Sequence, residues 1–198
     1  MKKKSKKNLN KILLKIGFFI YLLFLLAYSN AMAYEETDYE VVKKTEIYEI
    51  RKYSDRLAVQ VKQTNQNNSF RKLFKYISGA NHSSEKIDMT TPVTQTEKEN
   101  NLFMQFYLPS KFKKQTIPIP SNSEVEIVIM PGGYYAVIEY SGRSTDKNFN
   151  KHIKILKQKL LYDNISIKGT GIKATYNGPF TLPMLRRNEA MFKINWNY

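Results

Sequence analysis

The chain has 198 residues, of which 32 are basic, 17 are acidic and none is cysteine. Without cysteine it can form neither disulfides nor thiolate-based active sites, so its stability must come from packing alone. The net charge of +15 favours anionic partners.

The first 33 residues have the three-part pattern of a secretory signal peptide. Residues 1–11 carry six lysines and no acid, residues 16–28 are an uninterrupted apolar run, and the segment ends in Ala31-Met32-Ala33. This pattern predicts cleavage before Tyr34 and a mature protein in the periplasm or outside the cell. The alternative is an uncleaved N-terminal membrane anchor, although the run is short for a span of about 20 residues.

Residues 34–198 are enough for one domain with its own core. Seven of the 32 basic residues and none of the 17 acidic residues precede residue 34, which leaves this part with a net charge of +8. In an exported domain such a charge favours an anionic membrane surface or anionic small molecules as partners, and not nucleic acid.

The domain contains one pattern of elements twice. Alternating apolar strands flank Ser54-Asp55, and a second pair flanks the turn residues 131–133, which predicts two hairpins. A helix is expected after each hairpin, with Ser69 as the N-cap of the first and Gly79 as its stop. Two further strands follow each helix, at residues 88–96 and 101–109 in the first half and at 171–180 and 190–196 in the second.

Each half therefore has the order strand-strand-helix-strand-strand, over about residues 36–109 and 124–197. A linker rich in Pro, Ser and Lys joins them at residues 109–123. Within the first half, Met89–Val93 is expected to be an edge strand that bends, because Pro92 cannot donate to a ladder. The sequence predicts an α+β fold whose halves pair about a pseudo-two-fold axis as a distorted eight-stranded antiparallel barrel, flanked by two helices.

Four motifs in order, FRKLFKYISGAN, KIDMTTPV, FYLP and YNGPFTLPMLRRNE, resemble the SOUL haem-binding protein family over residues 36–197. The resemblance implies this same barrel and a tetrapyrrole ligand, haem, bound reversibly in a hydrophobic cleft beside the first helix. The helix positions that match are Phe70, Phe74 and Lys75, and the loop that matches runs from Tyr176 to Phe180. Relatives often carry Met at the two Phe positions, and Phe can stack on a porphyrin but cannot ligate its iron.

Each of these residues also has a structural interpretation. Phe70 and Phe74 share a predicted helix face with Leu73 and Ile77, and aromatic residues at this spacing are usually core. Lys75, like its neighbours Arg71 and Lys72, is a candidate partner for a haem propionate, but cations on a helix are usually solvated.

The candidate iron ligands are few. His82, in a polar loop after the first helix, is the candidate axial ligand, while His152 and Tyr176 are further possibilities. Arg186 and Arg187 are expected to form a surface ion pair with Glu189 that fixes the start of the last strand. No HExxH, GxSxG or phosphate-loop motif is present, which favours a binding protein over an enzyme.

The expected function is that of an exported haem or tetrapyrrole carrier, buffer or sensor. Two alternatives remain open: a small-molecule-binding module of the effector-binding or gyrase-inhibitor-like type, which also has doubled strand-strand-helix-strand-strand frames, and a haem-modifying enzyme.

Overall fold

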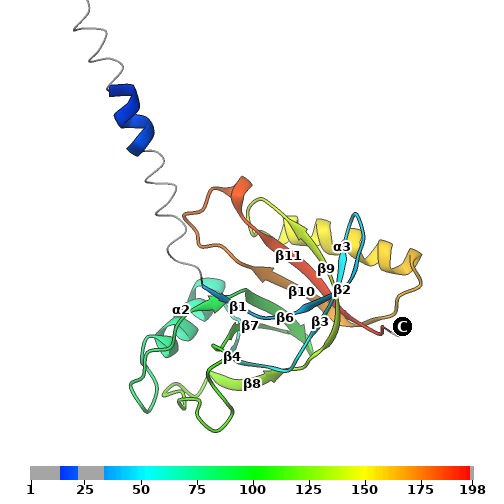
Figure 1. Cartoon of the computed structure of the whole chain (residues 1–198). Helices are drawn as coiled ribbons and strands as arrows, with labels where there is room; N and C mark the ends of the chain where they lie inside the picture. The colour runs from blue at the N-terminus through cyan, green and yellow to red at the C-terminus, as the bar shows by residue number, and fades with distance from the viewer. Residues whose placement is uncertain (1–13, 22–33, 197–198) are drawn as a thin grey trace, which may run out of the picture. The chain divides into compact units, whose positions relative to one another are not determined.

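A computed structural model describes residues 14–21 and 34–196 of the chain (Figure 1). It divides into two compact units, Met1–Tyr34 and Glu35–Tyr198. Residues 14–21 are helical, and no helix in the described part of the chain is long and apolar enough to cross a membrane. The predicted cleavage point before Tyr34 adjoins residues 22–33, which lie outside the described residues.

The second unit contains eleven strands, two α-helices and one 3-10 helix. The strands are β1 (Glu35–Glu36), β2 (Glu40–Lys44), β3 (Glu49–Tyr53), β4 (Arg56–Lys62), β5 (Thr90–Thr91), β6 (Val93–Lys98), β7 (Asn101–Tyr107), β8 (Glu126–Met130), β9 (Gly133–Tyr140), β10 (Ile167–Thr175) and β11 (Asn188–Ile194). The helices are α2 (Gln66–Ile77), α3 (Asp146–Tyr162) and η1 (Pro183–Leu185).

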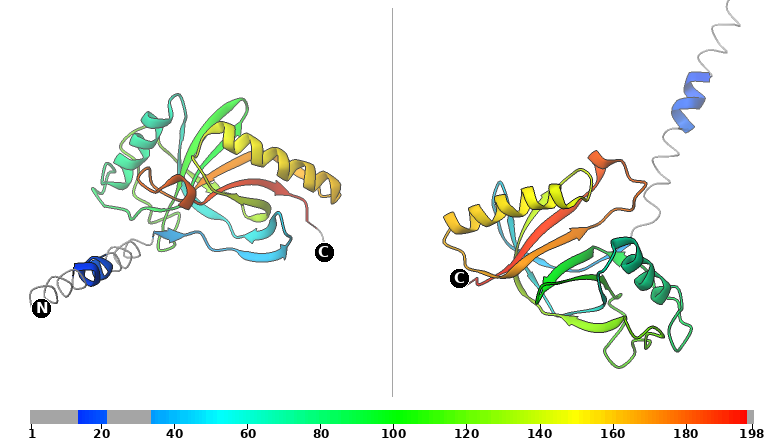
Figure 2. Two further views of the ribbon diagram at one scale, coloured as in Figure 1. Left: turned by 90° about the horizontal axis from the view of Figure 1, so that it is seen from above. Right: turned by 180° about the vertical axis from the view of Figure 1, so that it is seen from behind.

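Nine strands form one curled antiparallel sheet in the order β2-β3-β9-β11-β10-β6-β7-β4-β8. The sheet forms a half-barrel, and Figures 1 and 2 show α2 and α3 outside its curl. The α+β fold class predicted from the sequence is confirmed. The sheet has one strand more than expected, because β2 pairs with the outer edge of β3.

The two predicted hairpins are wrong, although their four strands exist. β3 pairs with β9, and β4 pairs with β8, so the first strand of each half joins the second strand of the other half. The halves meet again where β6 pairs with β10. This exchange of strands ties the two repeats into a single sheet.

Each helix covers its own core on the outer face of the sheet. α2 packs over β4 and β7 through a cluster that includes Val59, Leu73 and Met104, and α3 packs over β9 and β11. The predicted linker at 109–123 is not a free connection, because Phe112 and Ile117 belong to the α2 cluster. Within the described residues, 14–21 and 34–196, the core clusters consist of residues of this unit.

The edge strand that bends, expected at Met89–Val93, is confirmed for two residues and wrong for Val93. Thr90 and Thr91 form β5, which pairs in parallel with β1 in a separate two-stranded sheet. After Pro92 the chain enters β6, an interior strand between β10 and β7. The predicted bend therefore exists, but it carries the chain from the small sheet into the middle of the large one.

Candidate functional site

The N-cap of the helix α2 lies four residues earlier than predicted. Asn65, and not Ser69, is the N-cap, and its side chain accepts hydrogen bonds from the backbone nitrogens of Asn67 and Asn68 at 3.0 and 3.3 Å. Ser69 is instead buried within the helix. The cap satisfies two of the free N–H groups at the start of the helix. Because the helix begins at Gln66, Phe70 and Phe74 lie within its regular part.

Phe70 and Phe74 form an exposed aromatic edge on α2. The buried face of the helix consists of Ser69, Leu73, Tyr76 and Ile77. Phe70 and Phe74 lie beside this face, with 38% and 48% of their surface exposed. Their rings stack with centroids 6.1 Å apart and planes inclined by 13°. The structural interpretation of both residues as core is therefore wrong.

The sheet supports this aromatic edge from one side. The ring of Phe70 meets that of Phe106, on β7, edge to face at 5.1 Å. The ring of Phe70 is thus supported by the sheet, while both rings keep more than a third of their surface exposed. This arrangement offers a flat apolar surface for a planar ligand.

Two cations flank the aromatic edge. Arg71 and Lys75 are exposed, and neither has an ion pair among the described residues. Lys72, the third cation considered, is held by Glu124 at 2.6 Å. Arg71 and Lys75 are therefore the cations of α2 that can pair with the carboxylates of a ligand.

The loop between β10 and β11 is fixed by backbone contacts and yet exposes apolar groups. The guanidinium of Arg186 donates to the carbonyl oxygens of Thr181 at 2.7 Å and Pro179 at 2.6 Å. Asn177 accepts a hydrogen bond from the backbone nitrogen of Arg187 at 2.7 Å. Phe180, at the bend of this loop, is 99% exposed. Large apolar side chains that are exposed in this way often mark a binding surface.

The loop starts close to the aromatic edge. Thr175, the last residue of β10, pairs with Val93, which pairs with Phe106. Two strand spacings therefore separate the start of the loop from the residue that supports Phe70, a distance of about 10 Å. In every view of Figures 1 and 2 the loop lies at the same end of the sheet as α2. The structure thus brings the two predicted site segments to one end of the domain.

Tyr176 belongs to a buried charge cluster on the inner face of the sheet. Its hydroxyl donates to Glu189 at 2.8 Å, and Arg187 lies 3.8 Å over its ring. Burial first, and then the charge of Glu189, raise the pKa of Tyr176 well above its ordinary value. The phenol therefore stays protonated and engaged, which makes it a poor iron ligand.

Glu189 is the centre of this cluster and is completely buried. Arg51 donates to both of its carboxylate oxygens, at 3.0 and 3.1 Å, and Arg187 reaches it at 2.8 Å. Burial, the largest single effect, lowers the pKa of Arg51, but Glu189 and Tyr53 together outweigh burial and raise it. The predicted ion pair at the start of the last strand is present for Arg187, but its predicted position at the surface is wrong, because Glu189 is completely buried. The second cation that pairs with Glu189, Arg51, was not predicted, because no local sequence pattern indicates a partner in a strand 138 residues away.

Neither histidine lies against the aromatic edge of α2. His82 is exposed in the loop after α2, where its backbone nitrogen donates to Ile119. His152 stacks on Tyr140 with ring centroids 4.1 Å apart, and its Nδ1 lies 2.8 Å from the carbonyl oxygen of Asn148. Within the described ranges no group of three or more His, Asp or Glu side chains could hold a metal ion.

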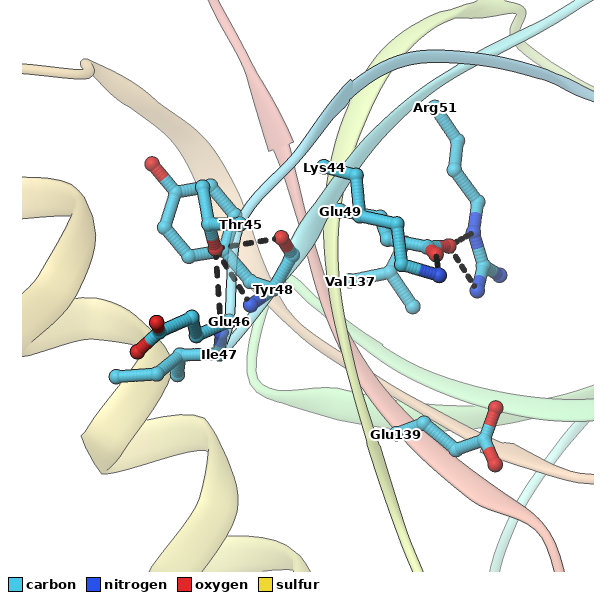
Figure 3. A pocket seen from close by; sticks show the side chains of 9 residues that line it. All are labelled: Lys44, Thr45, Glu46, Ile47, Tyr48, Glu49, Arg51, Val137 and Glu139. Carbon is cyan, nitrogen blue, oxygen red and sulfur yellow. Dashed lines mark hydrogen bonds and ion pairs between the residues drawn. The ribbon is translucent and has the colours of Figure 1, made fainter.

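A shallow hollow of about 240 Å³ lies beside the turn from β2 to β3 (Figure 3). Polar side chains dominate its lining, and Figure 3 shows Glu49 held between Lys44 and Arg51. Its volume is below the roughly 300–1,000 Å³ of most small-molecule pockets. The size and the charged lining exclude it as a porphyrin site.

Comparison with known proteins decides the family. The model of the SOUL heme-binding protein family matches residues 34–193. The chain belongs to the SOUL heme-binding protein family. This match covers both halves of the sheet, α2 and the loop at 176–187. No curated protein matches the sequence.

Solved structures with the same fold have very different sequences. The C-terminal domain of EcmrR has a TM-score of 0.56 at 10% identity, over 79% of this chain and 98% of that chain. A hydrolase from Listeria innocua has a TM-score of 0.55 at 9% identity, over 78% of this chain and 94% of that chain. An uncharacterized conserved protein from Listeria innocua has a TM-score of 0.51 at 9% identity, over 85% and 96%. At such low identities these similarities establish the fold alone.

Proposed function

We propose that this SOUL family member is an exported haem or tetrapyrrole carrier, buffer or sensor. The observation that carries the proposal is the exposed, parallel pair of rings of Phe70 and Phe74. A porphyrin laid on these rings would lie between α2 and the loop that exposes Phe180, with Arg71 and Lys75 placed to meet its propionates. Haem would supply only its own redox and ligand chemistry, while the chain binds and orients it.

The affinity expected from these contacts is modest. Burying a few hundred Å² of porphyrin contributes roughly 5–10 kcal/mol at about 25 cal/mol per Å². Association costs roughly 4–15 kcal/mol, so the apolar contact leaves at most about 6 kcal/mol, and without iron ligation the dissociation constant should be on the order of tens of micromolar or weaker. Such reversible binding suits a carrier, buffer or sensor better than an enzyme with a permanent haem.

The inner face of the sheet favours this proposal over an effector-binding module for organic cations. Glu189 is the fully buried carboxylate of this face with which such a cation could pair. It already has two guanidinium partners and a tyrosine hydroxyl. A cation would have to displace the guanidinium groups from Glu189. The displaced groups would lose their buried partner, which strongly destabilises the fold.

The test compares haemin with metal-free protoporphyrin, using the chain from residue 34 onward. We expect a saturable Soret shift with haemin and a quench of porphyrin fluorescence with the metal-free ligand, at affinities within about threefold, because stacking and propionate pairing do not need iron. Binding of haemin alone would show that an iron ligand carries the affinity and would favour the haem-modifying enzyme. Binding of neither would exclude the tetrapyrrole function.

Export and a membrane partner are part of the same proposal. The basic start, short apolar run and Ala31-Met32-Ala33 end support removal of residues 1–33. Mass spectrometry of the protein from its own cell envelope should show Tyr34 as the first residue, whereas an intact N-terminus in the membrane would indicate the anchor. The net charge of +8 beyond residue 33 supports an anionic membrane surface as a further partner.

A further inference from the structure

Large apolar side chains stand in solvent at η1. Leu182 is 59% exposed, Met184 73% and Leu185 68%, and we call these three residues the loop tip. Single exposed apolar residues are ordinary, whereas several on one short segment mark an interaction surface. None of the three is needed for the proposed haem site.

The loop tip is a fixed protrusion. The backbone nitrogen of Gly142 donates to the carbonyl oxygen of Pro183 at 2.8 Å, and that of Leu185 donates to Leu182 at 2.9 Å. Arg186 closes the loop behind them through its two carbonyl contacts. The apolar groups are therefore held outward before any partner arrives, which lowers the entropic cost of binding.

The helix α3 presents a basic stripe beside the loop tip. Lys147, Lys151 and Lys154 are all exposed, and their spacings of four and three residues put them on one face. That face is opposite the buried Leu156 and Leu160. Among the described residues none of the three lysines has an ion pair, so their charges face solvent without a partner.

The same face of α3 ends in apolar groups. Leu161 and Tyr162 are 77% and 79% exposed, and they continue the helical spacing of the basic stripe. The other end of α3 adjoins the loop tip, because Gly142 precedes the helix by a few residues and bonds to η1. A helix of 17 residues is about 25 Å long. The lysines thus lie along α3 between two apolar points, one at each end of the helix, and we call this surface the rim. Figure 1 and the right view of Figure 2 show the segment that holds η1 beside one end of α3.

We propose that this rim docks on an anionic phospholipid bilayer. The loop tip and the pair Leu161 and Tyr162 enter the boundary between headgroups and acyl chains, while the basic stripe lies against the lipid phosphates. A bilayer fits better than a protein partner, because lysines without ion pairs between two exposed apolar points match the phosphates and the acyl boundary of an anionic bilayer. The proposal is independent of haem binding, which uses Phe70 and Phe74.

The test exploits the absence of cysteine. Met184→Cys, in the chain from residue 34 onward, is labelled with an environment-sensitive fluorophore, and Ser123→Cys, exposed in the segment between the halves, is the control site. Without haem, vesicles containing phosphatidylglycerol should shift the emission of the Met184→Cys label to the blue and leave the Ser123→Cys label unchanged. Pure phosphatidylcholine vesicles should have little effect on either label.

Charge and apolar variants then test each part of the rim by vesicle sedimentation. Replacing Lys147, Lys151 and Lys154 by Gln should weaken binding to anionic vesicles ten- to a hundredfold, since each lysine near the surface contributes severalfold. The same replacement of Lys86, Lys113 and Lys114, which are exposed elsewhere, should cost less than threefold. Leu182→Ser with Leu185→Ser should weaken binding at least tenfold while haemin affinity stays unchanged.

Three results would overturn the proposal. The first is the absence of a blue shift at Met184→Cys on anionic vesicles. The second is equal weakening by the two lysine triples, which would indicate attraction by net charge alone. The third is a blue shift that grows with protein concentration in the absence of vesicles, which would identify the occupant of the loop tip as a second copy of the chain.

Discussion

Asp55 and Gly132 meet at the point where the two halves of the domain exchange strands. The Oδ1 atom of Asp55 accepts a hydrogen bond from the backbone nitrogen of Gly132 at 2.7 Å. The chain passes from β3 to β4 and from β8 to β9 through these two short connections, which lie against each other. Tyr53 pairs with Gly133 on one side of the crossing, and Arg56 pairs with Met130 on the other.

Gly132→Ala should therefore destabilise the whole domain. A Cβ atom at this position would lie 2.7 Å from the carbonyl oxygen of Tyr53 and 2.8 Å from the carbonyl carbon of Ser54. Both atoms are backbone, so the crossing itself would have to open, at a cost of roughly 1–3 kcal/mol. The free energy of unfolding from urea denaturation measures this effect.

Gly178→Ala is the matched control, because no heavy atom lies within 4 Å of the added Cβ. It should change the free energy of unfolding by less than about 0.5 kcal/mol. Equal losses in the two variants would mean that the crossing is not closely packed.

This crossing explains why the strands could be predicted and their partners could not. Alternation marks β3, β4, β8 and β9 in the sequence, and turn residues separate the members of each pair. A two-residue turn between alternating strands is the usual sign of a hairpin. The exchange of strands depends instead on contacts between residues far apart in the chain, such as Asp55 with Gly132, and local turn chemistry does not encode them.

Leu73→Ala should lower the free energy of unfolding by about 2–5 kcal/mol, the usual cost of truncating a buried Leu. Leu73 is completely buried between α2 and the sheet. Phe74→Ala, one position further along, removes a larger side chain that is 48% exposed, and should cost roughly 1 kcal/mol or less. A loss below about 0.5 kcal/mol for Leu73→Ala would show that this face of α2 is not packed.

The candidate site on α2 could also be predicted only as far as local sequence patterns determine it. Periodicity places Phe70, Leu73, Phe74 and Ile77 on one arc of α2, and it does not say which side of the arc is buried. The buried side is the one that carries Tyr76, whose hydroxyl donates to the carbonyl oxygen of Pro118 at 2.9 Å. The contact lies in the supposed linker, whose composition gave no sign of packing.

In the Tyr140→Phe variant, stability should fall less steeply with rising pH above pH 10 than it does in the wild type. Burial, and then the charge of Asp146, raise the pKa of Tyr140 to about 12. The unfolded chain ionises this phenol near pH 10, so its contribution is complete below pH 10 and is lost as the pH rises from about 10 to 12. Its hydroxyl has no hydrogen-bond partner among the described residues, so the variant should be at least as stable as the wild type at pH 7.

Thermal melts between pH 7 and pH 12 test this prediction. Tyr53 and Tyr76, whose pKa values burial also raises to about 12, should preserve part of the alkaline loss in the variant. An unchanged slope above pH 10, or a clear loss of stability at pH 7, would contradict the assignment of Tyr140 as a buried phenol without a partner.

Phe74→Ala should weaken haemin binding about tenfold, because an aromatic contact worth about 1.5 kcal/mol corresponds to one decade in affinity. The ring is exposed and stacks on Phe70, so it can contact a porphyrin without any rearrangement of the core. A haemin titration followed at the Soret band measures the loss, and the urea denaturation above shows whether the variant is folded.

His82→Ala and His152→Ala complete this test, because they separate aromatic stacking from iron ligation. His82 is exposed beyond the end of α2, and the ring of His152 is occupied by Tyr140 and the carbonyl oxygen of Asn148. Each substitution should change haemin affinity less than about threefold and leave the Soret maximum in place, since neither removes a stacking contact. Loss of the Soret shift in either variant, with Phe74→Ala neutral, would make histidine the iron ligand and the aromatic edge of α2 a bystander.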